Sequence, residues 1–208
     1  MNSIRQPFRY QYNGTVFWII GINILIFVLM YFLGFQGLRV FLSMIPELVV
    51  RGWVWTFVTY MFVHGGVSHI LFNMLALFIF GTQVERYMGS KEFLLFYFVT
   101  GILAGIFSFF VYYFTGVNVM LMGASGAIFA VELAYAILFP HAIIYIWGIL
   151  PLRAPVMVIG FTAIELASSV FGLNRGVAHL THLAGFGFAW LYFVIWLGIN
   201  PWQRLRMR

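Results

Sequence analysis

Long apolar stretches, broken by very few charged residues, most constrain how this sequence can fold. Hydrophobic residues make up 63% of the 208 residues, and charged residues make up only 8%. A soluble domain carries about a quarter charged residues, which cover its surface. This chain has too few charges for that, so lipid must be its solvent. The expected fold is therefore an all-α bundle of transmembrane helices.

Six stretches fit a helix that crosses the bilayer, which requires about 20 mainly apolar residues. They lie near residues 16–33, 68–85, 92–115, 125–139, 154–171 and 177–197. Between them, residues 34–66 contain only a short apolar run at 53–63, which predicts an interfacial or re-entrant segment. Residues 140–153 are apolar but interrupted by Pro140 and Pro151. One long span across this last segment is the less favoured alternative.

The basic residues predict the orientation of the bundle. Six spans place both termini on one side of the membrane, and the excess of Lys and Arg marks the cytoplasmic side. With the termini inside, the cytoplasmic segments hold Arg5, Arg9, Arg86, Lys91, Arg153, Arg204, Arg206 and Arg208, and the external segments hold Arg39, Arg51 and Arg175. We therefore expect a single transmembrane domain over 1–208, with a cytoplasmic N-terminal tail at 1–15 and a basic cytoplasmic C-terminal tail at 198–208.

The composition also excludes several kinds of site. Cysteine is absent, which removes disulfides, thiol nucleophiles and Cys-ligated zinc. The net charge of +6 comes from residues at membrane edges, which indicates cytoplasmic anchoring and no nucleic-acid binding. No HExxH motif is present, so we expect no metal and no cofactor. Metal or haem ligation by His179 and His182, three residues apart, is the alternative.

Polar side chains inside a bilayer are costly unless they are paired or wetted, so they indicate function. In the predicted topology the second, fourth and sixth spans all run from the outside to the inside. Their first turns carry His69 and Asn73, then Ser125, then His179 and His182. Three segments far apart in the sequence thus bring a serine, histidines and an amide to the same outer depth, as an active site requires.

Ser125 lies in the motif Gly123-Ala-Ser125-Gly126, which is also compatible with simple packing through small residues. The helix that it starts, 125–139, is about 22 Å long at 1.5 Å per residue, whereas the bilayer core is about 30 Å thick. Ser125 is therefore expected below the outer surface, in a water-filled cavity. Free N–H groups at a helix start can stabilise an oxyanion, which favours a nucleophile there.

His182 is the candidate base for that nucleophile. On a helix His182, Gly185 and Ala189 share one face, and small residues on it let another helix approach closely. A hydrogen bond between Ser125 and His182 requires such closeness. The alternative is a histidine satisfied by a backbone carbonyl. Phe129, one turn after the serine, is expected to stack on the imidazole.

A third, acidic member of the site is not expected. Aspartate is absent from the sequence. Glu132 lies two turns below Ser125, and Glu165 lies in the middle of its predicted helix, so both are interpreted as packing residues. The sequence therefore predicts a Ser125–His182 dyad rather than a triad.

His69 and Asn73 are four residues apart on one helix and face the same way. With the backbone N–H of Ser125, they could supply the neutral donors of an oxyanion hole. Hydrogen bonding between helices is the alternative. His64 is expected near the same mouth, more exposed and without a role.

Taken together, these motifs resemble the rhomboid family of intramembrane serine proteases. The resemblance covers residues 46–197, and its motifs in order are His64-Gly-Gly-Val-Ser-His69-Ile-Leu-Phe-Asn73, Gly81-x3-Glu85-x3-Gly89, Gly123-Ala-Ser125-Gly126 and His182-x2-Gly185. It implies that Ser125 is the nucleophile and His182 the general base, and that His69, Asn73 and the Ser125 amide bind the oxyanion. Ala189 and Phe129 stand where members of the family often have glycine and tyrosine.

The resemblance implies a multi-pass hydrolase of the minimal six-helix prokaryotic type. Such a serine endopeptidase cuts peptide bonds in or near transmembrane segments of membrane-protein substrates, without a cofactor. Its partners would be these substrates and the lipid bilayer, and its oligomeric state is open. It would lie in the plasma (inner) membrane with its active site toward the external or periplasmic side. The alternatives are an inactive relative that binds or escorts transmembrane helices, and a small transporter or haem-binding protein.

Overall fold

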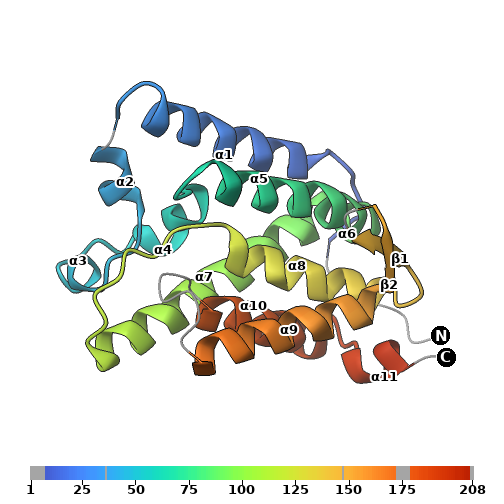
Figure 1. The fold of residues 1–208 in the computed structure, drawn as a ribbon. Helices are drawn as coiled ribbons and strands as arrows, with labels where there is room; N and C mark the ends of the chain where they lie inside the picture. Colours follow the sequence, from blue (N-terminus) through green and yellow to red (C-terminus); the bar gives the residue numbers. More distant parts are fainter. Residues whose placement is uncertain (1–7, 36, 147, 172–178, 207–208) are drawn as a thin grey trace.

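The computed structural model describes residues 8–35, 37–146, 148–171 and 179–206, and most of them are helical (Figure 1). The elements in chain order are α1 (Thr15–Tyr31), α2 (Gly37–Leu42), α3 (Pro46–Val50), α4 (Thr56–Thr59), the 3₁₀ turn η1 (Tyr60–Phe62), α5 (Val67–Ala76), the π-helical turn η2 (Leu77–Gly81), α6 (Thr82–Met88), α7 (Ser90–Thr115), α8 (Ser125–Leu138), β1 (Ile143–Ile146), β2 (Leu150–Arg153), α9 (Ala154–Phe171), α10 (His179–Leu191), the π-helical turn η3 (Tyr192–Trp196) and α11 (Pro201–Arg206).

The long helices lie alongside one another as a bundle. The start of α1, the β1–β2 pair and α11 lie at one end of it, and α2, α3 and α4 lie at the other (Figure 1). Each predicted span corresponds to one of these helices or to consecutive helical pieces, although the predicted start of the sixth, near residue 177, and Arg175 lie outside the described residues. Both tails, too, are described only in part, from residue 8 and up to residue 206.

Two helical stretches, Val67–Met88 and Ser90–Thr115, are long and apolar enough to cross a membrane. Three shorter apolar helices are Thr15–Tyr31, Ser125–Leu138 and Ala154–Ala167. The six-span topology with both termini inside therefore stays a prediction. Many large apolar side chains face outward from the described helices, as lipid contact would require.

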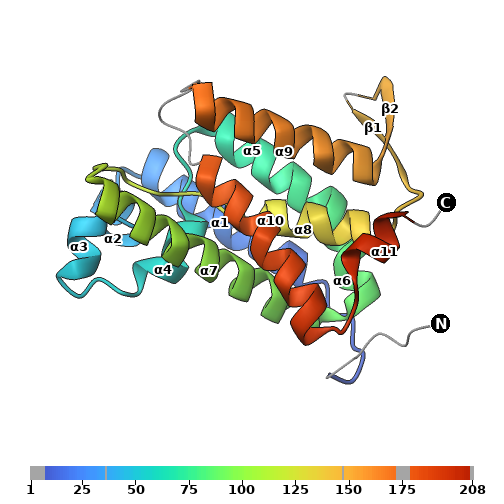
Figure 2. The same ribbon diagram turned by 90° about the horizontal axis from the view of Figure 1, so that it is seen from below.

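Helix α8 lies at the centre of the bundle, where it packs against α5, α7, α9 and α10 (Figure 2). It has 14 residues, several of them alanine or glycine, and ten of them are buried. Small residues let the surrounding helices come close, because they place little side-chain volume between two backbones. The first residue of this central helix is Ser125, so the fold itself carries the candidate nucleophile into the interior.

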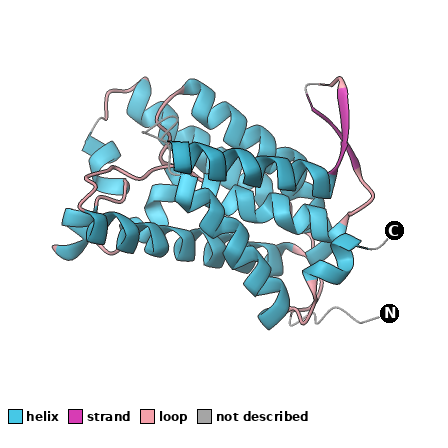
Figure 3. Ribbon diagram, turned by 60° about the horizontal axis from the view of Figure 1, so that its bottom comes forward, coloured by secondary structure: helices cyan, strands magenta, loops and turns pink. Residues whose placement is uncertain are grey.

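The segment after α8 differs from the all-α prediction. Residues that were expected to be irregular, or to belong to a long span, form an antiparallel pair in which Ile143 is opposite Arg153 (Figure 3). Ile143–Ile146 is rich in β-branched and aromatic residues, which favour strands. Pro151 does not prevent the pair, because a two-stranded sheet consists of edge strands, where proline is tolerated.

The buried carboxylate of Glu85 ties α1 to the turn between α6 and α7. It accepts hydrogen bonds from the backbone N–H and the hydroxyl of Thr15 at 2.6 and 2.8 Å, from the N–H of Val16 at 3.0 Å and from the hydroxyl of Ser90 at 2.5 Å. The first N–H groups of a helix have no partner within it, so this carboxylate caps α1 in place of a side chain at its own start. Within the motif Gly81-x3-Glu85-x3-Gly89, the glutamate therefore has a structural role.

Candidate active site

Ser125 and His182 meet at the centre of the molecule. Ser125 is the first residue of α8, and His182 lies in the first turn of α10. Ser125 Oγ lies 2.7 Å from His182 Nε2, which is hydrogen-bond distance. The histidine is buried, with 9% of its surface exposed, and the serine is half-buried. A serine and a histidine at this separation can exchange a proton directly, which is the geometry of an activated nucleophile.

The two helices approach closely because glycine lies at their crossing. A Cβ atom added to Gly185 would lie only 2.1 Å from the carbonyl oxygen of Gly126. A Cβ atom on Gly126 would in turn lie 3.2 Å from Thr181 Cγ2. Ala189, one turn further along the same face of α10, is fully buried. The face of small residues predicted from sequence therefore lies where α10 crosses α8.

Phe129 packs flat against the candidate base. Its ring centroid lies 4.3 Å from that of His182, and the two planes differ by only 12°. Phe129 follows Ser125 by one turn of α8, so serine and aromatic ring point to the same side of the helix. The stack limits tilting of the imidazole.

His69 faces the loop before Ser125 with a defined tautomer. Its Nδ1 accepts a hydrogen bond from the backbone N–H of Gly65 at 3.2 Å, so the ring proton is assigned to Nε2. This Nε2 lies 2.8 Å from the position that a Cβ atom of residue 123 would take. Gly123 has φ +122°, which side-chain-bearing residues rarely adopt. Two constraints therefore favour glycine at position 123: its positive φ and the short distance to His69 Nε2. The N–H at His69 Nε2 points toward the loop before Ser125.

Asn73 lies one turn further along α5 and is buried, with 8% of its surface exposed. Its Nδ2 donates to the carbonyl of His69 at 2.7 Å, which leaves one N–H of the amide for another acceptor. Its Oδ1 has no hydrogen-bond partner among the described residues. The two predicted donors, His69 and Asn73, therefore lie on one helix. One N–H of the Asn73 amide is already used by the carbonyl of His69.

A cavity of about 670 Å³ opens onto these residues. Ser125 and His182 line it together with His69 and Asn73. The apolar sides of the cavity come from α5, with Phe72 and Ala76, and from α9, with Phe161 and Ile164. The cavity is large enough to receive a segment of polypeptide beside the serine.

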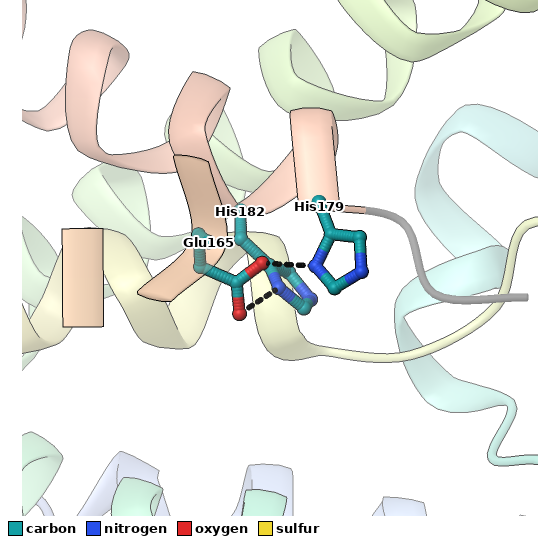
Figure 4. A group of neighbouring side chains, drawn as sticks. All are labelled: Glu165, His179 and His182. Carbon is teal, nitrogen blue, oxygen red and sulfur yellow. Dashed lines mark hydrogen bonds and ion pairs between the residues drawn. The ribbon is translucent and has the colours of Figure 1, made fainter. Parts of the chain in front are cut away.

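Glu165 is the site residue that sequence reasoning missed. It was expected to be a packing residue, but its Oε1 lies 3.2 Å from His182 Nδ1 (Figure 4). His179 Nδ1 donates to the other carboxylate oxygen at 2.6 Å. A usable signal was present, because a carboxylate in the middle of an apolar helix requires a partner. The rotation of α9 that turns it toward the histidines could not be obtained from the sequence.

Glu165, His179 and His182 are also the residues that could hold a metal ion. One ligand atom from each of Glu165, His179 and His182 lies within 4.8 Å of the others, and two histidines with a glutamate are a known zinc set. In this arrangement the carboxylate already satisfies His179 and contacts His182, so the groups are partnered by one another. The expectation of a site without metal stays a prediction.

His64 lies differently from its prediction. It was expected to be exposed near the mouth, but it is fully buried against His69, with ring centroids 4.9 Å apart. Neither ring nitrogen has a hydrogen-bond partner among the described residues. Burial, reinforced by the neighbouring His69, lowers the pKa of His64 from 6.5 to about 3. His64 is therefore neutral at physiological pH.

A family model and several known proteins match this chain. A family model described as the Rhomboid domain matches residues 51–199. The rhomboid protease GluP of Bacillus subtilis (strain 168) is 42% identical over 83 residues, which are 40% of this chain and 15% of GluP. The putative rhomboid protease YdcA of the same organism is 33% identical over 135 residues, 62% of this chain and 66% of YdcA.

The rhomboid protease GlpG of Salmonella choleraesuis (strain SC-B67) is 33% identical over 93 residues, which are 44% of this chain and 34% of GlpG. The chain thus spans less than two thirds of the length of each of these three relatives. In each comparison the similarity falls on a protein named as a rhomboid protease or putative rhomboid protease.

Proposed function

The chain belongs to the rhomboid family, and on that premise we propose that it is an intramembrane serine protease with Ser125 as nucleophile and His182 as general base. Relatives named as rhomboid proteases support protease activity. The observation that carries the residue assignment is the 2.7 Å separation of Ser125 Oγ and His182 Nε2 beside a cavity. Nothing in this geometry favours the inactive relative, because serine and histidine are both present and in contact.

The proposed reaction follows from that pair. His182 Nε2 accepts the proton of Ser125 as Oγ attacks the carbonyl carbon of the scissile peptide bond. The protonated imidazole then gives the proton to the leaving amine, and an acyl-enzyme remains on Ser125. A cavity water, deprotonated by the same nitrogen, hydrolyses the ester and restores the serine.

The tetrahedral intermediate carries a negative oxygen that needs donors. The Ser125 N–H lies at the start of α8, where N–H groups have no partner within the helix. His69 Nε2–H and the remaining N–H of Asn73 come from α5 on the other side of the cavity. We assign the oxyanion to these three donors, because neutral donors fixed before the reaction stabilise it without reorganisation.

The proposed substrates are membrane proteins whose transmembrane segments reach the cavity from lipid. The cavity has walls from both α5 and α9, so a segment entering between these helices would meet Ser125. Leu71 and Leu75 on α5 and Ile159 on α9 are exposed apolar side chains that would face the entering segment or lipid. We propose six spans with both termini in the cytoplasm, which sets the active site toward the external face of a prokaryotic plasma membrane.

The test is cleavage of a transmembrane test substrate by the purified protein in detergent. Wild type is expected to release two fragments and to be labelled by a fluorophosphonate probe. Ser125→Ala is expected to do neither while keeping its thermal stability within a few degrees. If wild type and Ser125→Ala give the same products, or if the probe labels both equally, the proposed function is wrong. Binding of the substrate without cleavage would support the escort function instead.

A further inference from the structure

Three helices contribute to one continuous line of contacts through the site. Ser125 on α8 contacts His182 on α10 at 2.7 Å, and Nδ1 of the same imidazole lies 3.2 Å from Glu165 Oε1 on α9. The second carboxylate oxygen accepts a hydrogen bond from His179 at 2.6 Å. Figure 4 shows the carboxylate of Glu165 pointing between the two imidazole rings. The base therefore has a serine at one nitrogen and a carboxylate at the other.

The stack on Phe129 restrains the plane of the base but not the direction in which its nitrogens point. It holds the plane of the His182 ring, at 12° to its own. A half-turn of the imidazole about its Cβ–Cγ bond keeps that plane but carries Nε2 away from Ser125. It also leaves the proton free to reside on either nitrogen. A group that recognises Nδ1 selects one ring orientation and one tautomer.

The carboxylate of Glu165 beside Nδ1 selects the ring orientation and the tautomer of His182. At 3.2 Å its negative charge favours the proton on Nδ1, which leaves Nε2 free to receive the proton of Ser125. When the imidazole becomes charged during the reaction, the carboxylate also supplies the opposite charge in a site where only 9% of the histidine surface is exposed. The 3.2 Å contact is not aligned as a regular hydrogen bond, but such bonds are often loose before substrate binds.

His179 fixes the carboxylate in turn. It lies on α10 one turn before His182, so one helix carries both rings that Glu165 contacts. The 2.6 Å hydrogen bond to Oε2 directs Oε1 toward His182. Glu165 is half-buried, and its partners come from a neighbouring helix rather than from its own. This is the arrangement of an orienting group supported by a second one.

We propose that Glu165 is a positioning residue that holds the imidazole of His182 through Nδ1 and so supports the reacting pair Ser125–His182. The inference rests on the proposed protease function. It assigns to His179 the role of holding Glu165. It differs from the sequence-based expectation that no acidic group takes part.

Steady-state cleavage of the transmembrane test substrate by Glu165→Gln tests the proposal. Glutamine keeps the shape but removes the charge and can offer an N–H to Nδ1. We expect kcat to fall about 10²-fold or more while KM changes less than about threefold. Glu165→Asp keeps the charge at a shorter reach and is expected to fall between glutamine and wild type. Thr162→Ala, a polar position one turn earlier on α9, is the matched control and is expected to keep wild-type kcat.

The rate of fluorophosphonate labelling separates chemistry from substrate entry, because the small probe needs no helix to enter. Labelling of Glu165→Gln is expected to slow in proportion to kcat. If Glu165→Gln does not fold, His179→Gln is measured instead and is expected to lower kcat at least threefold with KM preserved.

Two results would overturn the proposal. One is an unchanged kcat and labelling rate in the folded variants. The other is faster cleavage by Glu165→Gln, which would make the contact a latch that holds α9 closed. A wild type that neither cleaves nor labels would instead refute the proposed function itself, so the two failures are distinguishable.

Discussion

Replacing Gly185 by alanine should separate the two helices that carry the reacting groups. The new Cβ would lie 2.1 Å from the carbonyl oxygen of Gly126, which is backbone and cannot rotate away. An ordinary carbon–oxygen contact is about 3.3 Å, so α8 and α10 must move apart by roughly 1 Å. Overpacking of this kind costs about 1–3 kcal/mol of stability.

The same displacement acts on the Ser125–His182 pair, because Ser125 directly precedes Gly126 on α8 and His182 lies one turn before Gly185 on α10. Moving them apart by roughly 1 Å takes the 2.7 Å separation beyond hydrogen-bond reach. Misplacement by about 1 Å costs on the order of 10²-fold in rate. Gly185→Ala is therefore expected to lose about 99% of wild-type kcat/KM while it still folds.

The assay compares cleavage of the transmembrane substrate, fluorophosphonate labelling and thermal unfolding in detergent. The matched control is Gly187→Ala, on the same helix, where an added Cβ would meet nothing within 4 Å. It is expected to retain wild-type activity and stability. Activity of Gly185→Ala within twofold of wild type would refute the reasoning, and so would an equal loss in Gly187→Ala.

Three further predictions concern single positions. Gly123→Ala should lower kcat at least tenfold, because φ +122° disfavours a side chain and its Cβ would lie 2.8 Å from His69 Nε2; normal cleavage would contradict this. The pKa of His64 is about 3 in the folded protein and 6.5 in the unfolded chain. Between these two pH values the unfolded chain binds more protons than the folded protein. The folded protein therefore loses stability as the pH falls below 6.5. Wild type should lose about 1.6 kcal/mol of stability from pH 6.5 to 5 relative to His64→Leu, measured by unfolding in detergent; parallel curves would contradict the assignment. Glu85→Ala should destabilise the protein by about 2–4 kcal/mol, because the start of α1 at Thr15 loses its acceptor, and an unchanged melting temperature would exclude this cap.

The sequence was sufficient for features that depend on local patterns. The low share of charged residues, 8%, predicts lipid as solvent, because so few charges cannot cover the surface of a water-soluble domain. The 3.6-residue period puts His182, Gly185 and Ala189 on one face, and the structure has this face at the crossing with α8. The order of the motifs led to the rhomboid family, and the match over residues 51–199 confirms that membership.

Other features depend on how each helix is rotated and where it lies, which no local pattern records. Glu165 reaches His182 only because α9 packs beside α8 and α10 with that side turned inward. His64 is buried against His69 by the packing of the chain before α5, and Ile143–Ile146 becomes a strand because β2 pairs with it. The sequence by itself determined the solvent, the family and the nucleophile–base pair as a prediction. Only the tertiary structure decided which acid stands behind the base, because that contact joins helices whose relative rotation is set by the packing of the whole bundle.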